Sequence, residues 1–265
     1  MHVGNARTFM TAYERAVAAG GELVLRMEDL DMARCSQASA DAMIEDLHWL
    51  GIRWTEGPDM IGGPSAPYTQ SQRGDIYLAA WQRLNDAGLV YPSPQSRKDV
   101  ERAMAAPHEG EYGHAFPIGM RPDKVERVET PGLMNWRMRV NYGSTVRFTD
   151  NCAGPREYLA GRDFGDFIVW SKSGWPSYEL AVVVDDIAMG ITEVVRGDDL
   201  LISTARQILL FHALGAEAPE FYHCPLVRDK NGERLAKSAN GLTVRELRER
   251  GLTPQEVLKM ADGAV

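Results

Sequence analysis

The sequence predicts an α/β protein organised around a doubly wound sheet. Helical and strand-like patterns alternate over residues 1–91, and the alternation resumes at Phe164. Glycines directly follow several of the helical patterns, as is usual at helix C-termini. A chain of 265 residues is long enough for one large α/β domain or for a domain with an insertion.

Composition narrows the protein class. Hydrophobic residues make up 44% and charged residues 25%, as in ordinary globular proteins, and we expect neither a membrane partner nor an export signal. Cys35, Cys152 and Cys224 are widely separated and form no CxxC pair, which fits a reducing cytoplasm. The net charge of −8 does not indicate a nucleic-acid-binding protein, although local patches could still bind RNA.

The first 91 residues contain three predicted helices and two predicted strands. The helices are expected over residues 5–19, 36–50 and 73–88, and the strands over residues 23–25 and 89–91. Ser36 is a candidate N-cap of the second helix, and Gly51 ends it. The short apolar run of residues 23–25 is typical of a strand buried on both faces of a parallel sheet.

Residues 92–162 differ in character and are interpreted as an insertion. They are rich in Pro, Gly and Arg, and residues 135–148 alternate around an Asn-Tyr-Gly turn, which predicts a β-hairpin. Residues 121–147 contain six basic residues and three acidic ones, an excess of positive charge that could bind a phosphate backbone. A solvated hairpin face explains the same excess equally well. These basic residues are Arg121, Lys124, Arg127, Arg137, Arg139 and Arg147.

The second α/β half is followed by a helical tail. Strands are expected over residues 166–170, 178–186, 192–197 and 224–227, a helix over 198–215, and a polar loop over 228–241. Two capping boxes, Thr243 with Glu246 and Thr253 with Glu256, then predict two short helices.

Two segments suit phosphate binding. Residues 2–5, His-Val-Gly-Asn, precede a helix whose N-terminus offers unpaired N–H groups and a positive dipole end, although such a short string also recurs by chance. The segment "GERLAKS" presents Arg234, Lys237 and Ser238 in a loop that could close over a triphosphate. An exposed basic loop is the simpler alternative for the second segment.

Three further residues suit an amino-acid substrate. Glu28 follows a predicted buried strand, where its carboxylate could hold an ammonium group, a hydroxyl or Mg²⁺; a surface salt-bridge cluster with Arg26, Asp29 and Asp31 is the alternative. Arg196 ends another predicted strand, and its guanidinium matches a carboxylate, unless it pairs with Asp198 or Asp199. Tyr178 lies at the start of a predicted strand, and Asp185 and Asp186 lie at its end.

These segments together, in this order, resemble one family, the class I glutamyl-tRNA synthetases and their shorter relatives. Residues 2–5 are similar to its His-Ile-Gly-His motif, with Asn5 in place of the second histidine, and residues 234–238 are similar to its Lys-Met-Ser-Lys-Ser motif. The resemblance implies a Rossmann-like nucleotide-binding fold of the class I synthetase type. Its parts would be two catalytic halves (1–91 and 163–238), an inserted α+β subdomain (92–162) and a short helical tail (239–265).

The resemblance also implies the chemistry. ATP with Mg²⁺ would be bound by His2, Gly4, Asn5, Arg234, Lys237 and Ser238, with His2 and Lys237 stabilising charge on the phosphates during catalysis. Glu28, Tyr178 and Arg196 would bind glutamate, and Asp185 would support them.

Because 27 residues follow Ser238, we expect no anticodon-binding domain, as in the shorter relatives of the family. Those relatives transfer glutamate to queuosine in the anticodon of tRNA(Asp), and we expect the same partners for a monomer in the cytoplasm. A fragment of an enzyme that charges tRNA(Glu), and a non-catalytic module that binds tRNA or a partner, are the alternatives.

Two departures from the family pattern lead to further expectations. Ser93 and Gln95 stand where many members carry zinc-binding cysteines, so no structural zinc is expected. Family members also begin with a strand and an Arg-Phe-Ala-Pro-Ser-Pro-Thr-Gly-like segment that contacts glutamate. The first strand is therefore expected to be missing, with a start codon further upstream as the preferred explanation and a true, inactivating truncation as the alternative.

Overall fold

The computed structural model of the chain describes residues 1–31, 35–95, 115–227 and 243–263. The helices are α1 (Val3–Ala18), α2 (Gln37–Trp49), α3 (Gly74–Asp86), α5 (Tyr178–Ala188), α6 (Leu201–Ala213), α7 (Val244–Glu249) and α8 (Pro254–Gly263). The strands are β1 (Val90–Pro92), β2 (Trp136–Met138), β3 (Thr145–Asp150), β4 (Gly154–Leu159), β5 (Phe167–Trp170), β6 (Glu193–Gly197) and β7 (Glu220–Cys224). Short 3₁₀ turns are η1 (Gln70–Gln72), η2 (Ile118–Met120) and η3 (Asp198–Leu200).

The described strands form three small sheets. β1, β2 and β5 pair antiparallel, with β2 in the centre, and β3 and β4 form an antiparallel hairpin. β6 and β7 form a parallel pair, connected by η3 and α6. The pair β6–β7 therefore has the strand–helix–strand connection that the α/β prediction requires.

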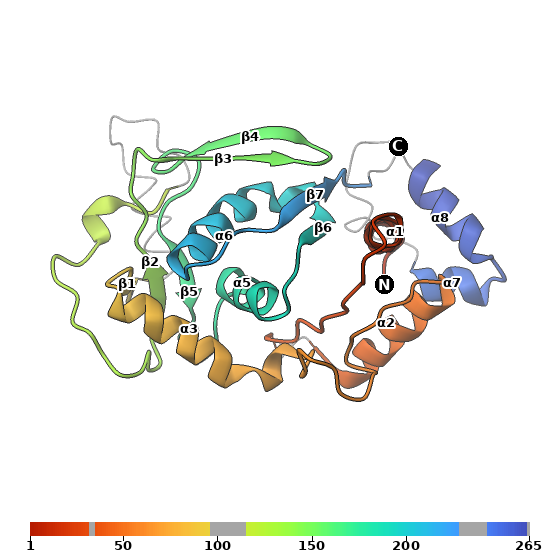
Figure 1. Cartoon of the computed structure of the whole chain (residues 1–265), viewed down its shortest axis with the longest axis horizontal. Helices are drawn as coiled ribbons and strands as arrows, with labels where there is room; N and C mark the ends of the chain where they lie inside the picture. Colours follow the sequence, from red (N-terminus) through yellow and green to blue (C-terminus); the bar gives the residue numbers. More distant parts are fainter. Residues whose placement is uncertain (32–34, 96–114, 228–242, 264–265) are drawn as a thin grey trace.

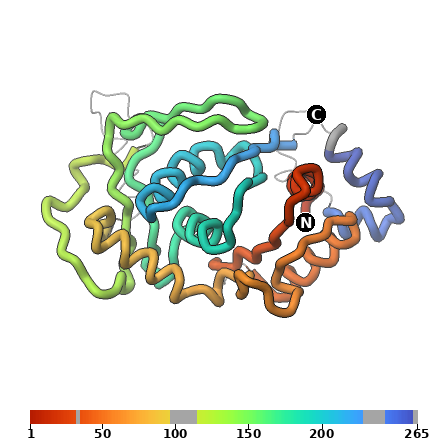
Figure 2. The backbone as a smooth tube through the Cα atoms, in the orientation of Figure 1, coloured from red at the N-terminus to blue at the C-terminus, as the bar shows by residue number. Residues whose placement is uncertain are grey.

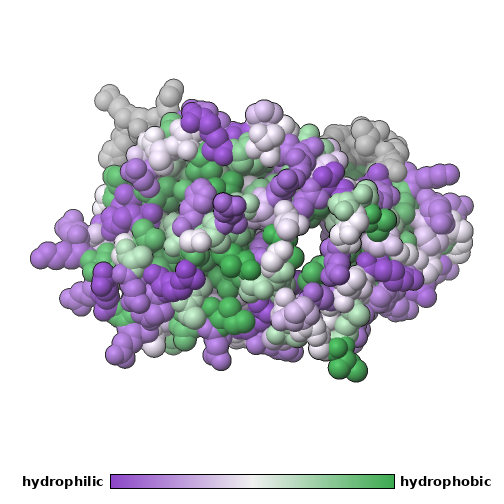
Figure 3. Space-filling model, viewed as in Figure 1, coloured by the Kyte–Doolittle hydropathy of each residue, from purple (hydrophilic) through white to green (hydrophobic). Residues whose placement is uncertain are grey.

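Two separate hydrophobic clusters organise the molecule. The larger one collects buried side chains from α3, α5, α6 and the sheets, and the smaller one collects them from α1, α2, α7 and α8. Figure 1 shows these two groups of elements side by side, and Figure 2 shows the first and last helices of the chain next to each other in the second group. The surface is hollowed between the two groups (Figure 3).

The prediction of a strand over residues 178–186 is wrong, because this segment forms helix α5. Every side chain from Glu179 to Asp186 is buried, since the helix packs against α3, α6 and β5. A helix buried on all sides has no polar face, so its sequence shows a continuous apolar run like that of a buried strand.

The predicted hairpin over residues 135–148 is also wrong, although its turn is present. Gly143 adopts a φ of 90°, and the Ser144 N–H donates to the Asn141 carbonyl. The two strands on either side nevertheless join different sheets, because β2 pairs with β1 and β5 while β3 pairs with β4. The alternation of apolar and polar residues predicted the strands correctly, but such a pattern does not show which strands pair with each other.

Two shorter predictions also need correction. Residues 23–25 form no ladder and make only isolated parallel contacts, including the bridge from Val24 to Glu56. The strand expected over residues 224–227 lies instead over Glu220–Cys224 and ends there, because Pro225 has no N–H to donate to the ladder.

The helix ends follow the predicted signals. The Ser36 hydroxyl accepts a hydrogen bond from the Ser39 N–H, and Thr243 and Glu246 form a reciprocal capping box. Thr253 and Glu256 make the same pair of contacts at the start of α8. Local side-chain chemistry thus determines where these helices begin.

A buried carboxylate holds β1 to the segment that follows β2. Asp166 accepts from the Tyr91 hydroxyl at 2.5 Å, from the Arg121 guanidinium at 2.6 and 2.7 Å, and from the Val140 N–H at 2.8 Å. Its side chain is fully buried, so these donors replace the water that the charge has lost.

Ser93 and Gln95 lie in the same region and do not fit a zinc site. The Ser93 hydroxyl donates to the Gln95 side-chain oxygen at 2.8 Å and accepts from the Arg137 guanidinium at 3.0 Å. Neither residue is a usual zinc ligand, and a positive guanidinium beside them opposes a divalent cation.

We predict that Asp166→Asn lowers the free energy of unfolding by about 3 kcal/mol, because it leaves the Arg121 charge without its buried partner. Urea unfolding followed by circular dichroism measures the change. Arg147→Gln breaks the exposed pair with Glu157 and serves as the control, with an expected change within about 0.5 kcal/mol. Equal effects of the two substitutions would contradict the role of Asp166 as the buried partner of Arg121.

Candidate active site

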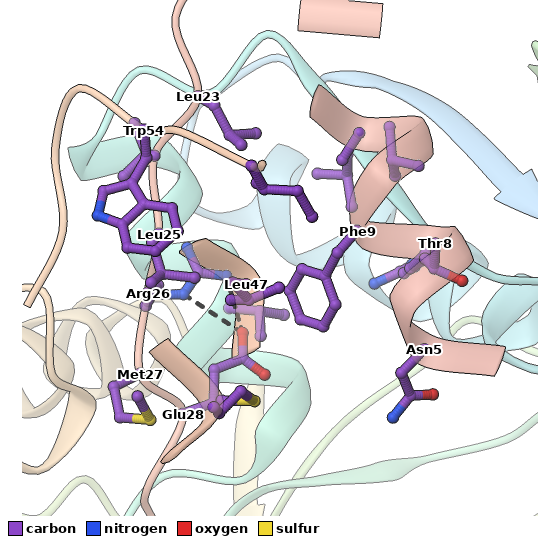
Figure 4. Close-up of a pocket in the computed structure, with 18 of the residues that line it drawn as sticks. Asn5, Thr8, Phe9, Leu23, Leu25, Arg26, Met27, Glu28, Leu47 and Trp54 are labelled. Atoms are coloured by element: carbon purple, nitrogen blue, oxygen red, sulfur yellow. Dashed lines mark hydrogen bonds and ion pairs between the residues drawn. The ribbon is translucent and has the colours of Figure 1, made fainter. Parts of the chain in front are cut away.

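A cavity of about 1320 Å³ lies between the two hydrophobic clusters. Its walls come mainly from α1, the extended segment of residues 21–29, α2, α5 and β6. Figure 4 shows Arg26 and Glu28 on the extended segment, with Asn5, Thr8 and Phe9 on α1. Elements from both halves of the chain therefore contribute to one site.

The three residues expected to bind glutamate all line this cavity. Glu28 belongs to the extended segment, Tyr178 is the first residue of α5, and Arg196 lies in β6. The Arg196 guanidinium donates to the Tyr178 hydroxyl at 3.3 Å. Partial desolvation in the cavity raises the pKa of Tyr178 even though the positive charge of Arg196 opposes this, so the hydroxyl stays protonated and can donate.

Buried groups fix the orientation of Arg196. Its Nη2 donates to the Thr204 hydroxyl at 2.7 Å, and its Nε donates to Nε2 of His223 at 3.2 Å. Two of the three guanidinium nitrogens are thus anchored on the protein side, and Nη1 lies beside the Tyr178 hydroxyl. A guanidinium held in this way is prepared to accept a carboxylate.

Arg26 holds Glu28 in the opposite wall. Its guanidinium lies 3.0 Å from the Glu28 carboxylate and 2.8 Å from that of Asp186 (Figure 4 draws the Arg26–Glu28 contact). Burial alone would lower the pKa of Arg26, but the carboxylates of Asp186, Glu28 and Asp185 outweigh it, and Arg26 stays charged. Burial raises the pKa of Asp186, although Arg26 opposes this shift.

Asp185 lies behind the cavity wall and not at a strand end. Its carboxylate is fully buried and accepts from Gln70, Arg73 and Tyr77 at 2.7 to 3.0 Å. It also lies 3.5 Å from the Arg26 guanidinium. Through Arg26, Asp185 supports the wall that carries Glu28.

The expected ATP-binding residues are only partly described. Gly4 and Asn5 line the cavity, whereas His2 is the N-cap residue of α1, does not appear among the described lining residues, and forms a backbone bridge to Thr243. The first turn of α1 contains no acidic side chain, which keeps the positive end of its dipole available to an anion. Arg234, Lys237 and Ser238 lie outside the described residues.

The basic residues of the region 121–147 are largely engaged within the protein. Arg121 pairs with Asp166, Arg137 contacts Ser93, and Arg147 pairs with Glu157. Lys124 and Arg127 are exposed. Arg121 and Arg137 therefore contribute to the fold, whereas the Arg147 pair is exposed, so only part of this local charge is withdrawn from a phosphate backbone.

Sequence reasoning did not identify several polar residues around the cavity. Arg26 was assigned only to a surface salt-bridge cluster, Asp186 was noted only beside Asp185 at a predicted strand end, and His223 and Thr204 were not singled out. Arg26 and Glu28 are two positions apart on an extended segment and so point to one side, which is a signal that could have paired them. Asp29 does not belong to that cluster, because its carboxylate accepts from the N–H and hydroxyl of Ser71.

Comparison with known proteins identifies the family of the chain. The family model described as "tRNA synthetases class I (E and Q), catalytic domain" matches residues 1–261. The chain is 43% identical over 255 residues to a Nitratidesulfovibrio vulgaris protein named "Glutamyl-Q tRNA(Asp) synthetase", a match that covers 95% of this chain and 78% of the relative. A protein of the same name from Symbiobacterium thermophilum is 42% identical, with 97% and 80% covered.

Longer relatives match as well. A Nitrosococcus oceani "Glutamate--tRNA ligase 2" is 37% identical, and the match covers 96% of this chain but 54% of that protein. The crystal structure of a glutamate-tRNA synthetase from Elizabethkingia anophelis matches with a TM-score of 0.75 and 27% identity, over 95% of this chain and 52% of the other. The chain thus spans about half the length of these longer relatives.

The structural similarity confirms the predicted fold of the class I synthetase type. In the part of the chain that the structure describes, no helix is long and apolar enough to cross a membrane. The chain belongs to the family of class I tRNA synthetases for glutamate and glutamine, whose catalytic-domain model it matches over residues 1–261.

Proposed function

We propose that the protein activates glutamate with ATP and transfers it to queuosine in the anticodon of tRNA(Asp). The observation that carries this proposal is the convergence of Glu28, Tyr178 and Arg196 on one cavity, beside the N-terminal turn of α1. The names of the two relatives above 40% identity, of which the chain covers more than three quarters, support the same substrates.

The charges of the cavity suit an amino acid with an additional carboxylate. Arg196 binds one carboxylate with the help of the Tyr178 hydroxyl, and Glu28 binds the ammonium group. Because Arg26 neutralises part of the Glu28 charge, the site does not present an excess of carboxylates to a negatively charged substrate. These assignments account for recognition at both ends of the substrate.

ATP occupies the part of the cavity next to α1 in this proposal and enters as its Mg²⁺ complex, with Mg²⁺ held mainly by the phosphates. Gly4 allows the backbone to approach a phosphate closely, and Asn5 lies beside it. His2, Arg234, Lys237 and Ser238 complete the phosphate contacts as expectations from their motifs. An oxygen of the glutamate carboxylate that Arg196 does not hold attacks the α-phosphorus, pyrophosphate leaves, and positive groups stabilise the added charge.

In the second step, a hydroxyl of queuosine attacks the activated carbonyl carbon and AMP leaves with the bonding electrons. The proposed organisation places both steps in the catalytic halves, residues 1–91 and 163–238. Residues 92–162 form the inserted subdomain and residues 239–265 the helical tail. We expect the protein to act as a monomer in the cytoplasm.

A second candidate function is the charging of tRNA(Glu), favoured by the 37% identity to glutamate–tRNA ligases. A module that only binds tRNA or a partner is the third. The first two candidates differ in which tRNA acquires glutamate, and in the third no tRNA acquires it. One transfer assay therefore separates all three.

We expect labelled glutamate to accumulate on tRNA(Asp) that contains queuosine and not on tRNA(Asp) prepared without it. The reason is that only the modified base offers the accepting hydroxyl. The measurement is acid-precipitable label in the presence of ATP. Label on tRNA(Glu) would replace this proposal with the second candidate, and ATP–pyrophosphate exchange without label on any tRNA would contradict the transfer step.

We also predict that Lys237→Ala slows glutamate-dependent ATP–pyrophosphate exchange by at least about tenfold, because one contact to the charge that develops on the phosphates is lost. Lys172→Ala removes an exposed lysine elsewhere and is the matched control. If both variants exchange at the wild-type rate, the loop of residues 234–238 has no role in activation.

A further inference from the structure

A buried carboxylate and a buried imidazole form a pair behind Arg196. Nδ1 of His223 in β7 lies 2.5 Å from the carboxylate of Asp150 at the end of β3, and both side chains have no exposed surface. The Asp150 carboxylate also accepts from the backbone N–H groups of Cys152, Ala153 and His223. These donors hold the pKa of Asp150 below its usual value against the effect of burial, so Asp150 remains an acceptor.

This arrangement fixes the protonation of the imidazole. Because the Asp150 carboxylate can only accept, Nδ1 of His223 carries the proton. On the other side of the ring, Nε2 faces Nε of Arg196 at 3.2 Å and the Thr204 hydroxyl at 3.0 Å. A guanidinium can only donate, so Nε2 must accept, and His223 is neutral.

We propose that His223 is a positioning residue that orients the Arg196 guanidinium toward the substrate carboxylate. It does so as the neutral Nδ1–H tautomer, which Asp150 fixes. A second proton on the ring disrupts glutamate binding. This inference rests on the proposed function, because it assigns the carboxylate of glutamate to Arg196. It concerns two residues, Asp150 and His223, that do not line the cavity and lie behind it.

The charged groups around the ring favour the neutral state at neutral pH. They are Asp150 from β3, Arg196 from β6 and Asp198 from η3. Burial lowers the pKa of His223 from its usual value and the Arg196 charge adds to this effect, while Asp150 and Asp198 oppose it without reversing it. The ring is therefore neutral at pH 7, and its protonation needs a lower pH than that of an ordinary imidazole.

Protonation would change the contact with Arg196 directly. Nε2–H would then point at the Nε–H of Arg196, which places two donors and two positive charges at a separation of 3.2 Å. The guanidinium would lose one of its two anchors and move from its bound orientation. A hydrogen bond to a charged group contributes about 1.5 kcal/mol, so loss of this anchor weakens glutamate binding about tenfold.

A purely structural role predicts a different pattern. If the Asp150–His223 pair only fastened β7 to the β3–β4 hairpin, its loss would lower stability and affect both substrates alike. A positioning role affects glutamate selectively, because in the proposed function ATP contacts α1 and residues of the 234–238 motif. The Michaelis constants for the two substrates therefore separate the two roles.

The test measures glutamate-dependent ATP–pyrophosphate exchange between about pH 5.5 and about pH 8 for the wild type and three variants. In His223→Gln the amide oxygen reaches the position of Nε2 and accepts from Arg196 without gaining a proton. In His223→Asn the shorter side chain retains a donor toward Asp150 and loses the acceptor. His212→Gln, an exposed position near the end of α6, is the matched control.

We expect the KM for glutamate of the wild type and of His212→Gln to rise as the pH falls through this range, while that of His223→Gln stays nearly constant. His223→Asn should show a KM for glutamate raised about tenfold at every pH, with the KM for ATP unchanged. The phosphates of ATP also change protonation in this pH range, and this change affects the KM values of all four proteins alike. Comparing the proteins with one another at each pH therefore removes it.

Two results would overturn the positioning role. One is the same pH dependence of the KM for glutamate in the wild type and His223→Gln. The other is an equal effect of His223→Asn on both Michaelis constants, which indicates a structural role alone. A wild-type protein without any glutamate-dependent exchange would instead refute the proposed function, and the inference with it.

Discussion

Buried carboxylates that hold arginines in place are the constraint on which this site depends. Asp185 and Asp186 near the end of α5 hold Arg26, and Asp150 acts on Arg196 through His223. Asp166 does the same for Arg121 away from the cavity. A buried charge that loses its partner costs several kcal/mol, so each arginine has one favourable orientation and the cavity is shaped before a substrate arrives.

Helix α5 connects these contacts to the core. Its first residue, Tyr178, lines the cavity, and its apolar middle is buried in the larger hydrophobic cluster. Its last turn carries Asp185 and Asp186, which support Arg26 and thereby Glu28. One buried helix thus positions groups at two places in the cavity wall, because the packing that fixes the helix also fixes both of its ends.

The sequence allowed the helices with local signals to be predicted, and these include α2, which Ser36 caps, and α7, which Thr243 and Glu246 cap. It did not reveal that residues 178–186 are helical, because a helix buried on every side shows no period. Glu28, Tyr178 and Arg196 were expected from the resemblance, and the structure brings them together. The contact between His223 and Asp150 joins residues 73 positions apart on different strands, and no local pattern indicates such a pairing.

The central claim is that Arg196 and Glu28 bind the two charged ends of one glutamate molecule. A crystal structure of the protein with glutamate bound, soaked at saturating concentration, tests it most directly. The account predicts a substrate carboxylate within hydrogen-bond distance of the Arg196 guanidinium, about 2.8 Å, and the ammonium group at the Glu28 carboxylate. Glutamate bound elsewhere in the cavity, with Arg196 still turned only toward Tyr178, Thr204 and His223, would contradict it.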